Sequence, residues 1–239
     1  SKYGSPIPAG SPVTISSTIP PSESLFSLVF STAFSIFSTI SSFKTGKVIF
    51  LNLSIFSCVI SLNEEIVERI EKAVEKAREE KDSLGGIVEI MVTGLPAGIG
   101  DPYFESMESE LSRMIFSVPA TKGIEFGAGF GITEMTGYEA NDEMYFDENG
   151  EIKSFTNNNG GIIGGITTGM PISFKVAIKP TASIEKAQKT VNLETKKNDI
   201  LEVHGRHDPI IVPRAVPVLE AATAIVILDR VLENNKYSK

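Results

Sequence analysis

A run of glycines followed at once by an alternating apolar segment constrains this chain more than any other feature. The run Asn157–Gly165 ends in Gly-Gly-Ile-Ile-Gly-Gly, and such a backbone can approach another group closely. Ile172–Ile178 then alternates apolar residues with polar or small ones, which predicts a half-buried strand. Lys179, Thr181 and Ser183 follow the strand and could hold a phosphate or another anion. The alternative is a glycine-rich turn beside an ordinary surface lysine. The glycine spacing matches neither common nucleotide-binding fingerprint.

The composition excludes several classes of partner and site. The formal charge of −8 argues against nucleic acid as a main partner. Cys58 is the single cysteine, so the chain has no internal disulfide framework and suits a reducing cytoplasm. No CxxC or HExxH motif is present, so we predict no metal site.

The first 62 residues differ from the rest in composition. They contain four charged residues, and two apolar runs lie at Ser24–Phe43 and Val48–Leu62. The first run is close to the minimum length of a membrane span but rich in Ser and Thr, and the second is too short. A membrane-anchored binding module is therefore one hypothesis.

A relation between codons explains this composition without a membrane. When residue i is paired with residue 106 − i, Pro20-Pro21 faces Gly85-Gly86, and Pro8-Ala9-Gly10 faces Pro96-Ala97-Gly98 in reverse. Glycine and proline codons begin with complementary bases, and codons of the other pairs are related in the same way from Ser1 to Lys44, except at Ser16, Phe26, Val29 and Phe37. Ser1–Lys44 therefore reads as the antisense translation of Leu62–Glu105. We infer an inverted repeat in the coding DNA, with Thr45–Ser61 as its hinge. Residues 1–62 are accordingly predicted to be a non-homologous, artefactual segment that packs poorly, and residues 63–239 a separate unit.

Periodicity and turn residues predict the elements of the second unit. These are a helix from about Asn63 to Lys81, a strand at Gly85–Val92, a loop at Leu95–Pro102, a helix at Tyr103–Phe116, a strand at Ile124–Phe126, two strands within Ile184–Val203 and a helix at Arg214–Asn234. Asn149-Gly150 predicts a hairpin turn inside the acidic segment Gly137–Phe155. That segment is interpreted as a solvated loop or lid, and calcium binding is the alternative, although the spacing is not that of an EF-hand.

A second motif, Gly205-Arg206-His207-Asp208-Pro209, precedes the last predicted helix. By itself it could be a structural turn, because Asp before Pro favours one. Together with Asn157–Gly165 and the Lys-Pro-Thr-Ala-Ser run at Lys179–Ser183, it resembles the chorismate synthase family. The resemblance covers about Asn63 to Asn235.

The resemblance implies an α+β fold, part of a β-α-β sandwich with antiparallel sheet and packed helices. It implies a lyase of the shikimate pathway of aromatic amino acid biosynthesis, which converts 5-enolpyruvylshikimate 3-phosphate to chorismate and phosphate with reduced FMN. It also implies a cytoplasmic homotetramer. Asp208 would be the acid/base group and His207 would orient its neighbours. The residues implied to bind the cofactor are Pro119, Ala120, Gly164, Lys179, Pro180, Thr181, Ala182, Ser183 and Arg206. His204 is expected to be a packed or solvent-facing histidine.

The chain also departs from the family pattern. The family's first half carries Gly-Glu-Ser-His-Gly, Arg-Pro-Gly-His and Arg-Ser-Ser-Ala motifs, none of which occurs in this sequence. The histidines of the chain are His204 and His207 alone. A catalytically inactive, truncated fragment is therefore the main alternative to an active enzyme.

Overall fold

The alternating segments of the sequence form the centre of an antiparallel sheet. The computed structural model describes residues 14–15, 54–56, 64–205 and 208–237. Strands β3 (Gly86–Thr93) and β9 (Ile172–Ile178) pair antiparallel, with Gly86 opposite Ile178 and Val92 opposite Ile172. Strand β4 (Thr121–Phe126) extends the sheet antiparallel to β9. Two short strands, β1 (Thr14–Ile15) and β2 (Ser54–Phe56), pair with β3, the first parallel and the second antiparallel.

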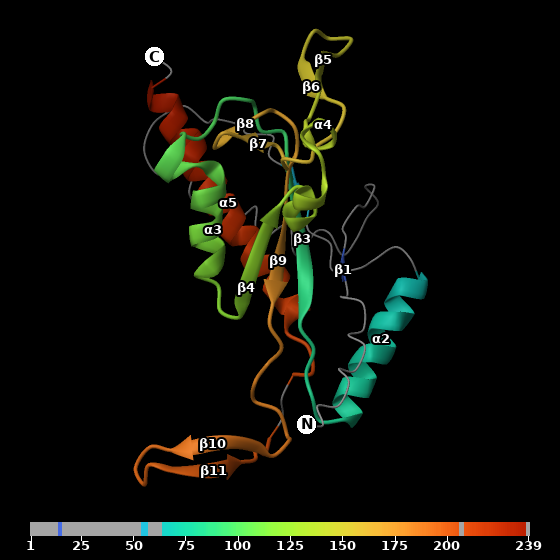
Figure 1. Ribbon diagram of the computed structural model, residues 1–239, viewed down its shortest axis with the longest axis vertical. Coiled ribbons are helices and arrows are strands. Elements are labelled where there is room, and N and C mark those ends of the chain that lie inside the picture. Colours follow the sequence, from blue (N-terminus) through green and yellow to red (C-terminus); the bar gives the residue numbers. More distant parts are fainter. Residues whose placement is uncertain (1–13, 16–53, 57–63, 206–207, 238–239) are drawn as a thin grey trace.

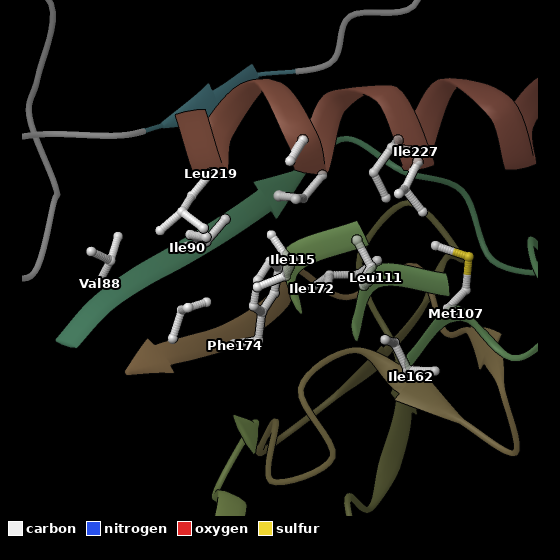
Figure 2. Packing of buried hydrophobic residues seen from close by; sticks show 14 of the residues in the cluster. Val88, Ile90, Met107, Leu111, Ile115, Ile162, Ile172, Phe174, Leu219 and Ile227 are labelled. Atoms are coloured by element: carbon white, nitrogen blue, oxygen red, sulfur yellow. The ribbon is translucent and has the colours of Figure 1, made fainter. Parts of the chain in front are cut away.

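Two helices cover one face of this sheet (Figure 1). They are α3 (Met107–Phe116) and α5 (Val212–Tyr237), which contact each other. Every second side chain of β9 points toward them and is buried, because successive side chains of a strand lie on opposite faces. Figure 2 shows the resulting core, to which β3 gives Val88 and Ile90, β9 gives Ile172 and Phe174, α3 gives Met107, Leu111 and Ile115, and α5 gives Leu219 and Ile227.

The remaining elements lie around this two-layer core. The helical ones are α2 (Glu64–Glu79), the 3₁₀ helices η1 (Tyr103–Glu105) and η2 (Gly129–Glu134), and α4 (Gly137–Ala140). Three antiparallel hairpins are formed by β5 (Met144–Phe146) with β6 (Ile152–Ser154), β7 (Ile162–Ile163) with β8 (Ile166–Thr167), and β10 (Gln188–Asn192) with β11 (Lys197–Leu201). The β7–β8 and β10–β11 hairpins lie at opposite ends of the molecule (Figure 1).

The structure confirms the α+β fold class and most of the predicted elements. The helix predicted at Tyr103–Phe116 is divided, because Ser106 has an extended backbone and its hydroxyl accepts a hydrogen bond from Ser109 N as the cap of α3. The last helix begins at Val212 rather than Arg214. The Asn149-Gly150 turn joins β5 and β6 as predicted, with Gly150 at a φ of 76°.

Several sequence predictions fall outside the described residues. The apolar run Ser24–Phe43 lies wholly outside them, and so does most of Val48–Leu62. Among the residues that the structure describes, no helix combines the length and the apolar character needed to cross a membrane. The same residues contain no group of three or more His, Cys, Asp or Glu that could hold a metal ion.

Candidate functional site

The end of strand β9 brings two of the predicted site segments together. Lys179, the first residue after β9, donates its backbone N–H to the carbonyl oxygen of Ala120 at 2.9 Å. Ala120 precedes the neighbouring strand β4 and has a φ of 72°, an unusual value for a residue with a side chain. Such backbone outliers often occur at functional positions. The structure therefore places Ala120 beside the Lys179–Ser183 run.

The segment that follows Asp208 also packs near the Lys179–Ser183 run. The contact is made through Ser83 and Leu84, which lie just before β3. Leu84 donates its backbone N–H to the carbonyl oxygen of Pro209 at 2.7 Å and forms an isolated parallel bridge with Ile210. The adjacent Ser83 donates its hydroxyl to the carbonyl oxygen of Thr181 at 2.6 Å. We call the assembly of Ser83–Leu84, Ala120, Lys179–Thr181 and Pro209–Ile210 the β9-end cluster. It joins four stretches that are far apart in the sequence.

Close backbone packing holds the cluster together. A Cβ added to Gly85 would lie 2.5 Å from the carbonyl oxygen of Ile178 and 3.0 Å from Cδ of Pro180. Only a glycine can occupy this position without displacing the backbone that leads into Lys179. Ser83, Leu84 and Gly85 were not predicted as site residues, because they belong to no motif and show their role only through these contacts.

The side chains of the cluster suit an anion. Lys179 is exposed and forms no ion pair within the described parts of the chain. Two other lysines do form ion pairs. The Nζ atom of Lys81 lies 3.9 Å from a carboxylate oxygen of Glu185, and that of Lys186 lies 2.6 Å from one of Asp82. The Oγ1 atom of Thr181 is buried and has no hydrogen-bond partner among the described residues. A free ammonium group and an unsatisfied hydroxyl are donors that can bind a phosphate or a flavin carbonyl.

Asp208 lies at the entrance of helix α5. Its carboxylate forms an ion pair with the guanidinium of Arg214 in the first turn of that helix. Both side chains are partly exposed, at 42% for Asp208 and 70% for Arg214, so the pair contributes little to stability. Arg206 and His207 lie outside the described residues. His204 is exposed, so of the two expected alternatives it is a solvent-facing histidine rather than a packed one.

The other predicted site residues are distributed unevenly. Pro119, Pro180, Ala182 and Ser183 are exposed on or next to the cluster. Gly164 is not part of it, because it lies in the β7–β8 turn beyond the other end of β9. A strand of this length spans about 20 Å. The single chain therefore does not bring Gly164 next to Lys179.

Comparison with known proteins identifies relatives for most of the chain. The family model described as "Chorismate synthase" matches residues 27–232, and so begins ahead of Asn63. The chorismate synthase of Methanocaldococcus jannaschii is 51% identical over 173 residues, which cover 72% of this chain and 45% of the relative. That of Methanothermobacter thermautotrophicus is 47% identical over 164 residues, covering 69% and 44%.

A solved structure agrees with these relatives. The one titled "Crystal Structure of Chorismate Synthase" superposes with a TM-score of 0.58 at 30% sequence identity, covering 71% of this chain and 44% of that chain. The chain spans about half the length of the curated relatives that it matches. The matched range, the identities and the shared fold together show that this chain belongs to the chorismate synthase family.

Proposed function

We propose that this chain carries one half of a site for the chorismate synthase reaction, the elimination of phosphate from 5-enolpyruvylshikimate 3-phosphate. The observation that carries the proposal is the β9-end cluster, in which Ala120, Lys179 and Thr181 meet the residues that follow Asp208. Ala120, Lys179, Thr181 and Asp208 are also residues that the family motifs assign to the site.

Within this site, Lys179 and Thr181 would bind the cofactor, since the same short run supplies an exposed cation and an unpaired hydroxyl. Pro119, Ala120, Pro180, Ala182 and Ser183 would line the same surface. Asp208 would accept or return a proton, and the ion pair with Arg214 would orient its carboxylate. Arg206 and His207, which precede Asp208 in the chain, would provide a further cofactor contact and orient its neighbours.

Reduced FMN is the cofactor that the family uses, and it supplies transient electron density to the reacting substrate. The donors of Lys179 and Thr181 fit the phosphate or a ring carbonyl of FMN, and they would contact the cofactor from one side. The cluster is a surface with exposed side chains rather than an enclosed pocket. Gly164 lies at the far end of β9, so we propose that it contacts the cofactor from another copy of the chain. A homotetramer, as the resemblance implies, is therefore part of the proposal, together with a cytoplasmic location away from membranes.

We further propose that this chain alone is a catalytically inactive part of the enzyme. It lacks the histidine and arginine motifs of the family's first half, and it spans about half of its relatives. Losing a general acid alone slows a reaction about a hundredfold or more. Chorismate formation by the purified chain with reduced FMN should therefore not exceed that of a control without protein. Formation above that control, abolished by Asp208→Asn, would contradict this proposal.

FMN binding tests the site separately from activity. Fluorescence titration of the full chain should show weaker FMN binding after Lys179→Ala, by about tenfold, which is typical of a lost charged hydrogen bond. Arg206→Ala should weaken it more than Ser183→Ala, since charge-assisted contacts are about twice as strong as neutral ones. Lys197→Ala is the matched control, because Lys197 is an exposed lysine of β11 at the turn end of the β10–β11 hairpin. Equal effects of the two lysine substitutions would argue against a flavin site here.

A further inference from the structure

One buried carboxylate is not used by the proposed site. Asp142 lies in the acidic segment Gly137–Phe155, whose other charged residues are exposed or half-exposed. Its side chain is 6% exposed. Burial of an ionised carboxylate is costly unless hydrogen bonds replace the lost water. The surroundings of Asp142 therefore have to supply donors.

Four donors meet this carboxylate, and they come from Thr156 and from two asparagines that open the glycine-rich run. Oδ1 accepts from Thr156 Oγ1 at 2.7 Å and from Asn158 N at 2.7 Å. Oδ2 accepts from Asn159 N at 3.0 Å and from Asn159 Nδ2 at 2.8 Å. Both oxygens thus act as acceptors, and the ionised carboxylate can accept from all four donors at once.

The turn that Asp142 holds is linked to the glycine-rich hairpin. Ser173 at the start of β9 donates its N–H to the carbonyl oxygen of Gly160 at 3.1 Å, and Thr168 donates its N–H to that of Gly161 at 3.0 Å. Gly160 and Gly161 have φ values of 64° and 79°, so the turn has a defined left-handed backbone. The β7–β8 hairpin, with Gly164 at its tip, begins at the next residue, Ile162.

We propose that Asp142 is a positioning residue, which fixes the Asn157–Gly161 turn and through it the orientation of the β7–β8 hairpin. Its relevance to cofactor binding rests on the proposed function, in which Gly164 contacts FMN. Hydrogen bonds from Asn159, Thr156 and Asn158 lower the pKa of Asp142 in spite of its burial, so the carboxylate stays ionised at neutral pH. Two other charged residues lie in the same segment. Lys153 lines the same small pocket as Asp142, and the carboxylate of Glu139 accepts a hydrogen bond from the backbone N–H of Thr136.

Hydrogen exchange measured at single amides of the full chain tests the positioning role without FMN. Asp142→Asn replaces one acceptor oxygen by an NH₂ group, which faces two donors. The amides of Asn158, Asn159 and Thr168 should then exchange about tenfold faster or more, relative to those of β3 and β9, because local opening follows the lost contacts. Thr156→Val removes a single donor and should give roughly a threefold increase on the same grounds. It keeps the test decisive if Asp142→Asn does not fold.

Asp147→Asn is the matched control. Asp147 lies in the same acidic segment and accepts hydrogen bonds from Asn149 N and Glu151 N within the β5–β6 turn. Its substitution should leave exchange at Asn158, Asn159 and Thr168 within about twofold of the unsubstituted chain. Unchanged exchange in Asp142→Asn, or a uniform increase across β3 and β9, would overturn the proposal, since Asp142 would then have no role or only a global one.

An FMN titration of the same variants separates this inference from the proposed function. If the unsubstituted chain binds FMN, Asp142→Asn should weaken binding by about fivefold or more while Asp147→Asn leaves it unchanged, because a misplaced hairpin loses its contact. Equal FMN affinity in Asp142→Asn and the unsubstituted chain would remove the link to the cofactor. If the unsubstituted chain binds no FMN, the proposed function fails, and the exchange data still decide whether Asp142 positions the hairpin.

Discussion

Single residues fix the geometry of this chain where its backbone segments cross. A Cβ added to Gly127 would lie 2.1 Å from the carbonyl oxygen of Asn158, and one added to Gly160 would lie 2.7 Å from that of Ser173. Gly127 N and Ala128 N both donate hydrogen bonds at this crossing, to Ser173 O and Asn158 O respectively. The crossing therefore requires glycines at these positions. It also holds the Asn157–Gly161 turn, which donates hydrogen bonds to the carboxylate of Asp142.

The adjacent glycines of the β7–β8 turn should respond differently to substitution. Gly164 and Gly165 have φ values of 61° and 87°. An added Cβ at Gly164 meets nothing within 4 Å, whereas at Gly165 it would lie 2.6 Å from Asp101 O and 2.7 Å from Ser106 Cβ. Gly164→Ala should therefore destabilise the chain by about 1 kcal/mol, the cost of a left-handed alanine, and Gly165→Ala by distinctly more. Urea unfolding measures both, and equal losses would show that the turn does not pack against the Asp101–Ser106 segment.

Asp142 should make stability depend on pH in acid. Burial raises its pKa, but the hydrogen bonds from Asn159, Thr156 and Asn158 outweigh burial, so the pKa is lowered in the folded chain. Its contribution is then present above a pH of roughly 3.9, the usual value for an aspartate in an unfolded chain. It is lost as the pH falls through the lower folded-state pKa.

The difference between the unsubstituted chain and Asp142→Asn isolates this contribution from Glu139, whose pKa is also lowered, by its hydrogen bonds with Thr136. Near neutral pH the variant should be less stable by about 3 kcal/mol, because two hydrogen bonds to a charged group are lost. The difference should shrink as the pH approaches that of the folded-state titration. Urea unfolding at several pH values measures it, and a difference that does not change with pH would contradict the assignment.

At the scale of elements, helix α5 has two apolar sides with different surroundings. One side recurs at helical spacing, which predicts that it is buried, and the structure buries all of its residues: Val216, Leu219, Ala222, Thr223, Val226, Ile227 and Val231. Val218, Ile225 and Leu232 lie on the other side and are exposed. Packing against the sheet thus depends on one stripe of the helix, and the other stripe contributes little to the stability of the single chain.

Truncation on the two sides of α5 should separate these contributions. Leu219 is 0% exposed and Ile225 is 53% exposed. Leu219→Ala should destabilise the chain by about 2–5 kcal/mol, since it leaves a cavity between α5 and the sheet. Ile225→Ala should cost under about 1 kcal/mol, as surface substitutions usually do. Thermal or urea unfolding gives both values, and similar losses would mean that both sides of α5 are buried in solution.

At the scale of the whole molecule, we propose that residues 1–62 differ in origin from the rest of the chain. Within residues 1–62, the structure describes β1 and β2, which add two and three residues to the edge of β3. The family match begins at residue 27. The division into residues 1–62 and 63–239 remains a proposal that rests on the antisense relation of Ser1–Lys44 to Leu62–Glu105.

Limited proteolysis tests this division. Residues 1–62 should be removed early and leave a resistant product that begins near Asn63, because an antisense segment was never selected to complement this core. Mass spectrometry of the products over time gives the cleavage sites. A resistant first segment with rapid cleavage inside β3, β9 or α5 would contradict the division and would show that β1 and β2 belong to the stable sheet.

The sequence by itself determined the elements and the family. Alternation over Ile172–Ile178 and the apolar stripe of α5 were sufficient, because local periodicity states which side of an element is buried. The order of the motifs at Asn157–Gly165, Lys179–Ser183 and Gly205–Pro209 was sufficient for the chorismate synthase family, which the comparisons confirmed. The division of the helix at Ser106 was missed, since the apolar spacing continues across that residue.

Only the tertiary structure decided which of these residues meet. Ser83 and Thr181 are 98 positions apart, and no motif connects them, yet the hydroxyl of one binds the carbonyl oxygen of the other. The structure also separated Gly164 from Lys179, although both belong to the same glycine-rich and strand segment, because the length of β9 lies between them. It showed that Asp142, one acidic residue among several, is buried against the Asn157–Gly161 turn. Periodicity reports the faces of elements, whereas contacts between distant segments depend on how strands and loops pack in three dimensions.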